Sequence, residues 1–142
     1  MFELGCHMID RVVALLGKPR RVTGRLRHDS AVDDTLADNT LAVLEYDSAL
    51  AEVYVAAMQP HDGNYRTLEI LGTNGTARVR PFSPLRLRLD LGDPTGPYSS
   101  GIQDVPLTAP PGPAFAPDFR ELAGVIRDGA KPTYSPEHDL AV

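Results

Sequence analysis

The first sixteen residues carry apolar side chains at the spacing of an amphipathic helix. The apolar positions are Leu4, Met8, Ile9, Val12, Val13, Leu15 and Leu16. Gly17 follows directly and Pro19 comes two residues later, and both residue types commonly end helices. We therefore predict a helix over residues 3–16.

Two further helical segments are expected near the C-terminus. Apolar residues recur on one side of a helix between Pro117 and Arg127, and Asp128-Gly129 follows as its end. A third helix is expected to begin at Pro136, because proline is favoured at the first helical position.

The middle of the chain alternates polar and apolar residues with period two, which indicates strands. The expected strands cover residues 21–28, 39–46, 50–57, 65–73, 76–80, 85–91 and 102–107. Asp47-Ser48-Ala49 is a short hairpin connection. Asn74-Gly75 is predicted to supply both central residues of a type I′ turn, which need positive φ. The polar and acidic residues 28–38 and the Pro- and Gly-rich residues 92–117 are expected to form loops.

The same alternation assigns two faces to the sheet. Helices are expected on one face, with the alternating set Leu41, Val43, Val53 and Val55. The second set consists of Thr40, Ala42, Glu52, Tyr54 and Ala56. Because it carries two alanines and a tyrosine, the second face is less polar than a sheet face exposed to water usually is.

The order of elements predicts the fold class. Neighbouring strands joined by short turns pair antiparallel, and strands segregated from helices form an α+β fold. We predict an open, predominantly antiparallel sheet with helices packed on one face. The chain shows no internal repeat and no linker, so residues 1–142 are expected to form one domain.

Composition narrows the function classes. The 142 residues are 42% apolar and 23% charged, as in soluble globular proteins. The net charge of −5 argues against a nucleic-acid partner, and no apolar run is long enough for a membrane span. Cys6 is the single cysteine, so a reducing, cytoplasmic location is expected.

Three polar residues gather on the first predicted helix. Glu3, His7 and Asp10 lie at positions i, i+4 and i+7, within an arc of about 60° and opposite the apolar stripe. Histidine suits proton transfer near neutral pH, and a carboxylate one turn away can orient its ring. Spacing alone leaves two readings open, namely an ordinary solvated helix face and an acid–base site. A metal site is not expected, since no third strong ligand is near.

Other polar runs are expected to be structural. Asp33, Asp34 and Asp38 lack the central glycine and bidentate glutamate of a calcium loop, so no metal is expected there. Residues 18–27 contain five basic side chains. They could meet a phosphate or an acidic substrate, but we interpret them as a solvated strand face. His61 lies in a sequence typical of a turn, His61-Asp62-Gly63-Asn64.

The residues around the first helix resemble the Gfo/Idh/MocA oxidoreductases, which include glucose–fructose oxidoreductase and inositol dehydrogenases. The segment FELGCHMID followed by LLGKP resembles the family pattern D-x-G-x-H-x-x-D with an apolar run ending in Leu-Gly. The segment LEILGTNGTA resembles the family hairpin E-x-x-G-T-x-G. Residues 119–129, Pro132 and the EHDL segment at 137–140 follow in the expected order.

This resemblance implies a C-terminal domain whose open sheet is backed by helices. The substrate would lie between this domain and an N-terminal Rossmann domain that holds NAD or NADP. The E-K-P motif of the catalytic lysine and a G-x-G-x-x-G turn are both absent from this sequence. No cofactor is therefore expected on this chain alone, and the isolated chain is expected to be inactive.

The resemblance also implies roles for individual residues. His7 matches the active-site histidine that exchanges a proton with the substrate hydroxyl. Glu3 matches a position usually held by Asp, which touches substrate or orients the histidine. Asp10 matches a second acidic, supporting position at the substrate site, and His61 lies in a loop that can approach substrate. The uncovered sheet face would pack against its copy in a homodimer.

The sequence therefore leads to one main hypothesis. We expect the C-terminal substrate and oligomerisation domain of an NAD(P)-dependent oxidoreductase that acts on CH-OH groups of a sugar, inositol or related polyol. The uncapped first helix and the short final helix lead us to expect truncation at both ends. A non-catalytic binding or assembly module of the same fold is the alternative, and an unrelated α+β domain is a third possibility.

Overall fold

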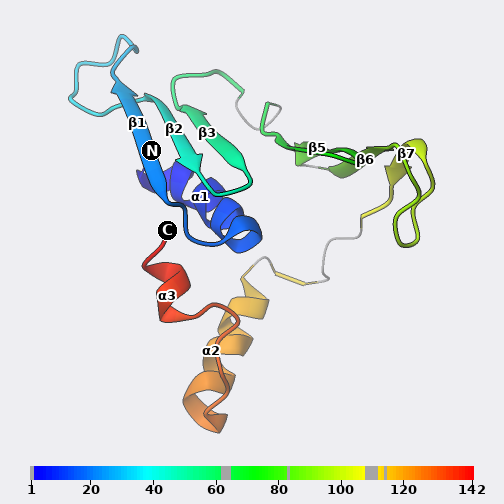
Figure 1. Ribbon diagram of the computed structural model, residues 1–142. Helices are drawn as coiled ribbons and strands as arrows, with labels where there is room; N and C mark the ends of the chain where they lie inside the picture. Colours follow the sequence, from blue (N-terminus) through cyan, green and yellow to red (C-terminus); the bar gives the residue numbers. More distant parts are fainter. Residues whose placement is uncertain (1, 62–64, 83, 108–111, 114) are drawn as a thin grey trace. The chain divides into compact units, whose positions relative to one another are not determined.

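The computed structural model describes residues 2–61, 65–82, 84–107, 112–113 and 115–142, except the side chains of residues 2–4 and 82. Its elements are α1 (Phe2–Leu16), β1 (Arg21–Arg27), β2 (Asn39–Glu45), β3 (Leu50–Ala56), β4 (Leu68–Gly72), β5 (Gly75–Phe82), β6 (Leu85–Leu91), β7 (Gly101–Val105), α2 (Ala116–Asp128) and α3 (Pro136–Asp139). The chain divides into two compact units, residues 1–59 with 114–142 and residues 60–113 (Figure 1).

The first unit contains an antiparallel sheet in the order β1-β2-β3. β2 lies in the centre, and its residues alternate between buried and half-buried positions. The turn between β2 and β3 is closed by the Tyr46 amide, which donates to the Ala49 carbonyl over 3.0 Å. This confirms the short hairpin at Asp47-Ser48-Ala49.

Helix α1 crosses one face of this sheet and forms the core with it (Figure 1). The buried side chains of the sheet are Ala42, Leu44 and Val53, and Met8, Ile9 and Val12 of α1 are among those packed against them. Thr40 is also buried, and its hydroxyl donates to the Val55 carbonyl over 3.4 Å. The apolar stripe of α1 therefore anchors the helix and turns its polar stripe away from the sheet.

The assignment of the two faces from the sequence was wrong for β2. Leu41 pairs with Tyr54 and Val43 with Glu52, so these four side chains share the open face. Ala42 pairs with Val53 on the face toward α1. The alternation of residues shows which side chains of one strand share a face. Which residues of the neighbouring strand lie on that same face depends on the register between the two strands.

The second unit is an antiparallel sheet in the order β4-β5-β6-β7. One face carries the row Leu68, Val79, Leu87 and Val105 and the row Ile70, Ala77, Leu89 and Gln103. The opposite face carries a charged row in which Arg78 bonds Glu69 and Arg88 bonds Asp104. Opposite charges on neighbouring strands support this register.

The turn between β4 and β5 differs from the predicted type I′ turn. Gly72 pairs with Gly75, so Thr73 and Asn74 occupy the central positions. Asn74 is not at positive φ, whereas Gly75 has a φ of 144°. The Asn-Gly pair is shifted by one position because Gly75 is needed inside the strand, where β6 approaches closely.

The two C-terminal helices are short. α2 ends at Gly129, whose left-handed φ of 62° suits a glycine cap. Its apolar residues Phe119, Leu122 and Ile126 are exposed in the described structure. α3 is a single turn capped by Ser135, whose hydroxyl accepts the His138 amide, with Pro136 at its start. The structure thus confirms the predicted start of α3 and the predicted bounds of α2 to within one residue.

The structure confirms the α+β class and the antiparallel strand pairing. Among the described residues, no helix combines the length and apolar character needed to cross a membrane.

Candidate functional site

His7 lies on the polar stripe of α1, opposite the side that packs on the sheet. Its side chain is exposed, while Gly5 and Val13 on the other side of the helix are buried. Among the described side chains, none bonds the His7 ring. An exposed imidazole on a helix whose opposite side is anchored can exchange a proton with a small molecule that reaches this surface.

Asp10 lies one turn after His7, and both of its carboxylate oxygens have partners. Oδ1 is 2.7 Å from Nε2 of His138, and Oδ2 accepts a hydrogen bond of 2.8 Å from Nε of Arg11. Burial favours the neutral acid, but the hydrogen bonds from His138 and Arg11 outweigh it and lower the pKa of Asp10. Asp10 is therefore a carboxylate at neutral pH.

The segment that reaches Asp10 is built around two stacked rings. The Tyr134 and His138 rings lie 4.4 Å apart between centroids at an interplanar angle of 22°. The Arg11 guanidinium lies 5.8 Å from the centroid of the Tyr134 ring. Residues 134–138, which we call the C-terminal turn, are thus joined to α1 by a hydrogen bond and a cation–π contact, with the ring stack holding the two contacts together.

The sequence did not identify His138 and Tyr134 as partners of the first helix. The EHDL segment shows only a resemblance to the family pattern. The sequence shows only that His138 lies in a short helix that begins at a proline. Because His138 is 128 positions from Asp10, helical or strand spacing could not show that the two residues are in contact.

The other two predicted site residues are less well defined. The Glu3 side chain lies outside the described part of the structure. His61 is exposed at the end of the described segment before residues 62–64, with a left-handed φ of 56°. It belongs to the second unit, whereas His7 and Asp10 belong to the first. The roles of Glu3 and His61 stay predictions.

The acidic loop at residues 28–38 is organised around His28. Nδ1 of His28 lies 2.7 Å from the Leu36 carbonyl and Nε2 lies 2.9 Å from the Val32 carbonyl. The Asp38 carboxylate accepts the amides of Asp29 and Ser30 over 2.8 and 3.1 Å. The hydrogen bonds from Ser30 and the Asp29 amide lower the pKa of Asp38 to about 2. In the described structure, these hydrogen bonds organise the loop around His28 and Asp38.

Much of the basic run is paired with acidic residues. Arg20 forms an ion pair with Asp47, and Arg21 lies 3.9 Å from the Glu45 carboxylate. Arg27 bonds Asp29 over 2.7 Å. These pairs agree with the interpretation of the run as a solvated strand face.

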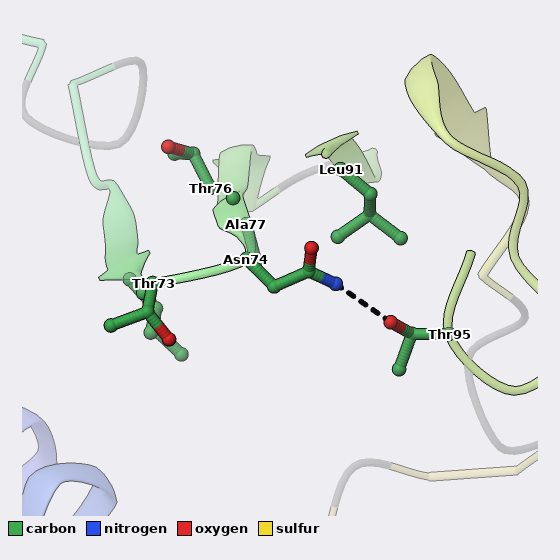
Figure 2. A pocket seen from close by; sticks show the side chains of 9 residues that line it. Thr73, Asn74, Thr76, Ala77, Leu91 and Thr95 are labelled. Carbon is green, nitrogen blue, oxygen red and sulfur yellow. Dashed lines mark hydrogen bonds between the residues drawn. The ribbon is translucent and has the colours of Figure 1, made fainter. Parts of the chain in front are cut away.

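A shallow hollow of about 340 Å³ lies at the β4–β5 turn (Figure 2). The Asn74 side chain crosses it and donates to Thr95 Oγ1 over 2.8 Å, and its Oδ1 accepts the Asp93 amide over 2.8 Å. None of its lining residues is ionisable. The hollow therefore offers no acid–base chemistry, and Asn74 serves to hold the turn that follows β6.

The described residues do not form a dinucleotide cradle. Such a cradle needs a parallel strand–glycine turn–helix unit, whereas every strand pair in the described structure is antiparallel. Within the same residues, no three His, Cys, Asp or Glu side chains gather to hold a metal ion.

The fold of this chain is similar to that of several solved structures, including three candidate oxidoreductases. The candidate oxidoreductase yvaA from Bacillus subtilis has a TM-score of 0.75 and 17% identity over 99% of this chain. The candidate oxidoreductase yhhX follows with a TM-score of 0.72 and 16% identity over 97% of this chain. A candidate oxidoreductase from Bacteroides fragilis has a TM-score of 0.67 and 14% identity over 99%.

This chain spans less than half of each of those proteins, 46% of yvaA and 44% of each of the other two. Curated proteins give no match to the sequence. The family model described as the GFO/IDH/MocA C-terminal domain matches residues 1–78, which include α1 and the sheet that it covers. The chain therefore belongs to the GFO/IDH/MocA oxidoreductase family and carries its C-terminal domain.

Proposed function

We propose that this chain is the substrate-side domain of an NAD(P)-dependent oxidoreductase that acts on a CH-OH group of a sugar, inositol or related polyol. The observation that carries the proposal is the exposed imidazole of His7 on the polar stripe of an anchored helix. The family match, which covers α1, supports it.

The nucleotide would be held by a Rossmann domain elsewhere in the parent protein, because the described part of this chain lacks a cradle for it. The dinucleotide supplies redox chemistry, and this chain supplies proton handling and orientation. His7 would accept a proton from the substrate hydroxyl, or donate one to the carbonyl in the reverse direction. Glu3, one turn before His7, would orient the ring or touch the substrate.

The open face of the β1–β3 sheet supports a proposed homodimer. Leu41 and Val43 lie on it beside Tyr54 and Leu50, which are 60% and 72% exposed. Burying such a face against a second copy would remove this apolar surface from water.

The test of the proposed function is turnover by the parent oxidoreductase with a panel of hexoses, inositols and other polyols, with NAD and NADP. His7→Ala and His7→Gln should each lower kcat about 100-fold or more, since a positioned general base contributes about that much. Gln keeps a polar side chain but cannot exchange the proton.

Arg120→Ala, at an exposed position of α2, is the control and should leave turnover unchanged. Unchanged turnover of His7→Ala would remove His7 from the mechanism. A parent protein that binds neither nucleotide would favour the non-catalytic module instead.

A further inference from the structure

We propose that His138 is a positioning residue for His7 and acts through Asp10. This inference rests on the proposed function, because it assigns to the C-terminal turn a part in the same site. It concerns a contact between α1 and α3, two elements at opposite ends of the chain.

The first step of the argument is the closeness of the contact. The Asp10–His138 hydrogen bond of 2.7 Å is part-buried, and the two side chains are 23% and 14% exposed. A hydrogen bond to a charged group that is partly shielded from water is stronger than one on the surface. Tyr134 stacks on the His138 ring and restricts its orientation.

The second step is the place of the contact on α1. The apolar stripe of α1 packs on the sheet through Met8, Ile9 and Val12. The polar stripe is held by the C-terminal turn at Asp10, one helical turn from His7. Fixing a helix on both sides restricts its rotation about its own axis, and that rotation determines where the His7 ring points.

The third step is charge. Arg11 and His138 engage the two oxygens of Asp10, so that each carboxylate oxygen already has a partner other than His7. Without His138, one oxygen would be released on the side of α1 that carries His7. A free carboxylate there could bind the His7 ring and turn it away from the substrate.

The experiment compares three substitutions in the parent oxidoreductase. His138→Ala should lower kcat about tenfold, because small misplacements of a catalytic group are costly, while the KM for the nucleotide stays unchanged. His138→Gln retains an N–H donor for Asp10 and should restore kcat to within about threefold of the wild type. Asp139→Asn alters a neighbouring carboxylate in α3 and should have no effect.

Amide hydrogen exchange of the same parent protein provides a readout besides activity. His138→Ala and Asp10→Asn should each speed exchange in both α1 and the C-terminal turn, and His138→Gln should speed it less. Faster exchange confined to the C-terminal turn, with α1 unaffected, would overturn the proposal, as would unchanged kcat in His138→Ala.

The two proposals fail in different ways. If His7→Ala leaves turnover unchanged, the proposed function of His7 fails, and the positioning role fails with it. If His7→Ala abolishes turnover but His138→Ala does not change kcat, only the positioning role fails. A loss of kcat in His138→Ala that His138→Gln does not rescue also counts against it.

Discussion

His28 shows how a single ring can depend on its protonation state. Each of its two nitrogens faces a backbone carbonyl, at 2.7 and 2.9 Å, and a neutral imidazole has only one N–H to donate. Only the imidazolium satisfies both carbonyls. The carboxylates of Asp38 and Asp34 face it at 3.3 and 3.6 Å and favour the same charge.

This arrangement predicts a pH-dependent stability. The Leu36 carbonyl is the main cause that raises the pKa of His28; partial burial opposes it, and the Val32 carbonyl and the two carboxylates add to it. A raised pKa means that the stabilisation is complete below the ordinary pKa of 6.5 and is lost as the pH rises through the raised value. The wild type should therefore exceed His28→Gln in Tm at about pH 5.5, and the difference should shrink toward about pH 8.5.

Thermal unfolding of both proteins across this range checks the prediction. A Tm difference that does not change with pH would contradict it. The NMR titration of the His28 ring protons gives the midpoint directly, and Asp38→Asn should move that midpoint down, since it removes a facing carboxylate.

At the residue scale, the sequence could place His7 and Asp10 on one side of a helix because helical spacing is local. It could not find the partners of Asp10, since the contact with His138 depends on how the chain returns to α1. It predicted a loop at these aspartates, but it could not show that Asp38 binds backbone amides and faces the His28 ring.

The close approach of β6 to Gly75 leads to a prediction about the stability of the β5–β6 strand pair. An added Cβ would lie 2.0 Å from the Asp90 carbonyl oxygen, and the φ of 144° is one that side chains rarely adopt. Gly75→Ala should lower the free energy of unfolding by about 2 kcal/mol or more, because β5 and β6 must separate.

Gly72 is the matched control, since it pairs with Gly75 across the same hairpin. A Cβ there would lie 3.5 Å from the Gly75 carbonyl oxygen, an ordinary contact, and no positive φ is involved. Gly72→Ala should change stability by less than about 1 kcal/mol in urea unfolding. Equal losses at the two glycines would contradict the explanation.

The elements themselves were largely predictable, because period two and period 3.6 are properties of short segments. β6 was found with its observed ends, and α1 and α2 within one residue at each end. The turn at Thr73-Asn74 and the faces of β2 were not, since both depend on register between strands. Asn74 lies in the turn as predicted but without the predicted positive φ, and its side chain holds the segment after β6.

At the scale of the whole chain, few apolar side chains are buried. Among the described residues, they are Val13, Ala42, Leu44, Val53 and Leu89. Large apolar residues such as Leu26, Leu71 and Ile126 are 66%, 79% and 73% exposed. A chain of 142 residues that buries so little within each unit is expected to gain stability from further contacts.

The open face of the β1–β3 sheet has a charge pattern suited to a second copy. β1 places Arg21, Arg25 and Arg27 along one edge of this face, and β3 places Glu52 near the other. A two-fold axis parallel to the strands would place β1 of one copy over β3 of the other, and thus the arginines of one copy over Glu52 of the other, with Leu41 and its neighbours between them. An isologous contact of this kind repeats each interaction twice.

This geometry predicts that the chain is a dimer that Leu41→Lys converts to a monomer. The introduced ammonium would lie next to Arg25 across the strand pair, and no acidic side chain in that row would neutralise it. Because an unpaired charge is costly to bury, the dimer should dissociate at least about 100-fold more readily. Leu140→Lys introduces the same change at an 88% exposed position and should leave the dimer intact. Sedimentation velocity over a range of concentrations measures the association of both variants.

The two substitutions add the same charge. Loss of the dimer in both variants would therefore indicate general repulsion rather than a contact at this face. A wild type that stays monomeric at high concentration would rule the contact out.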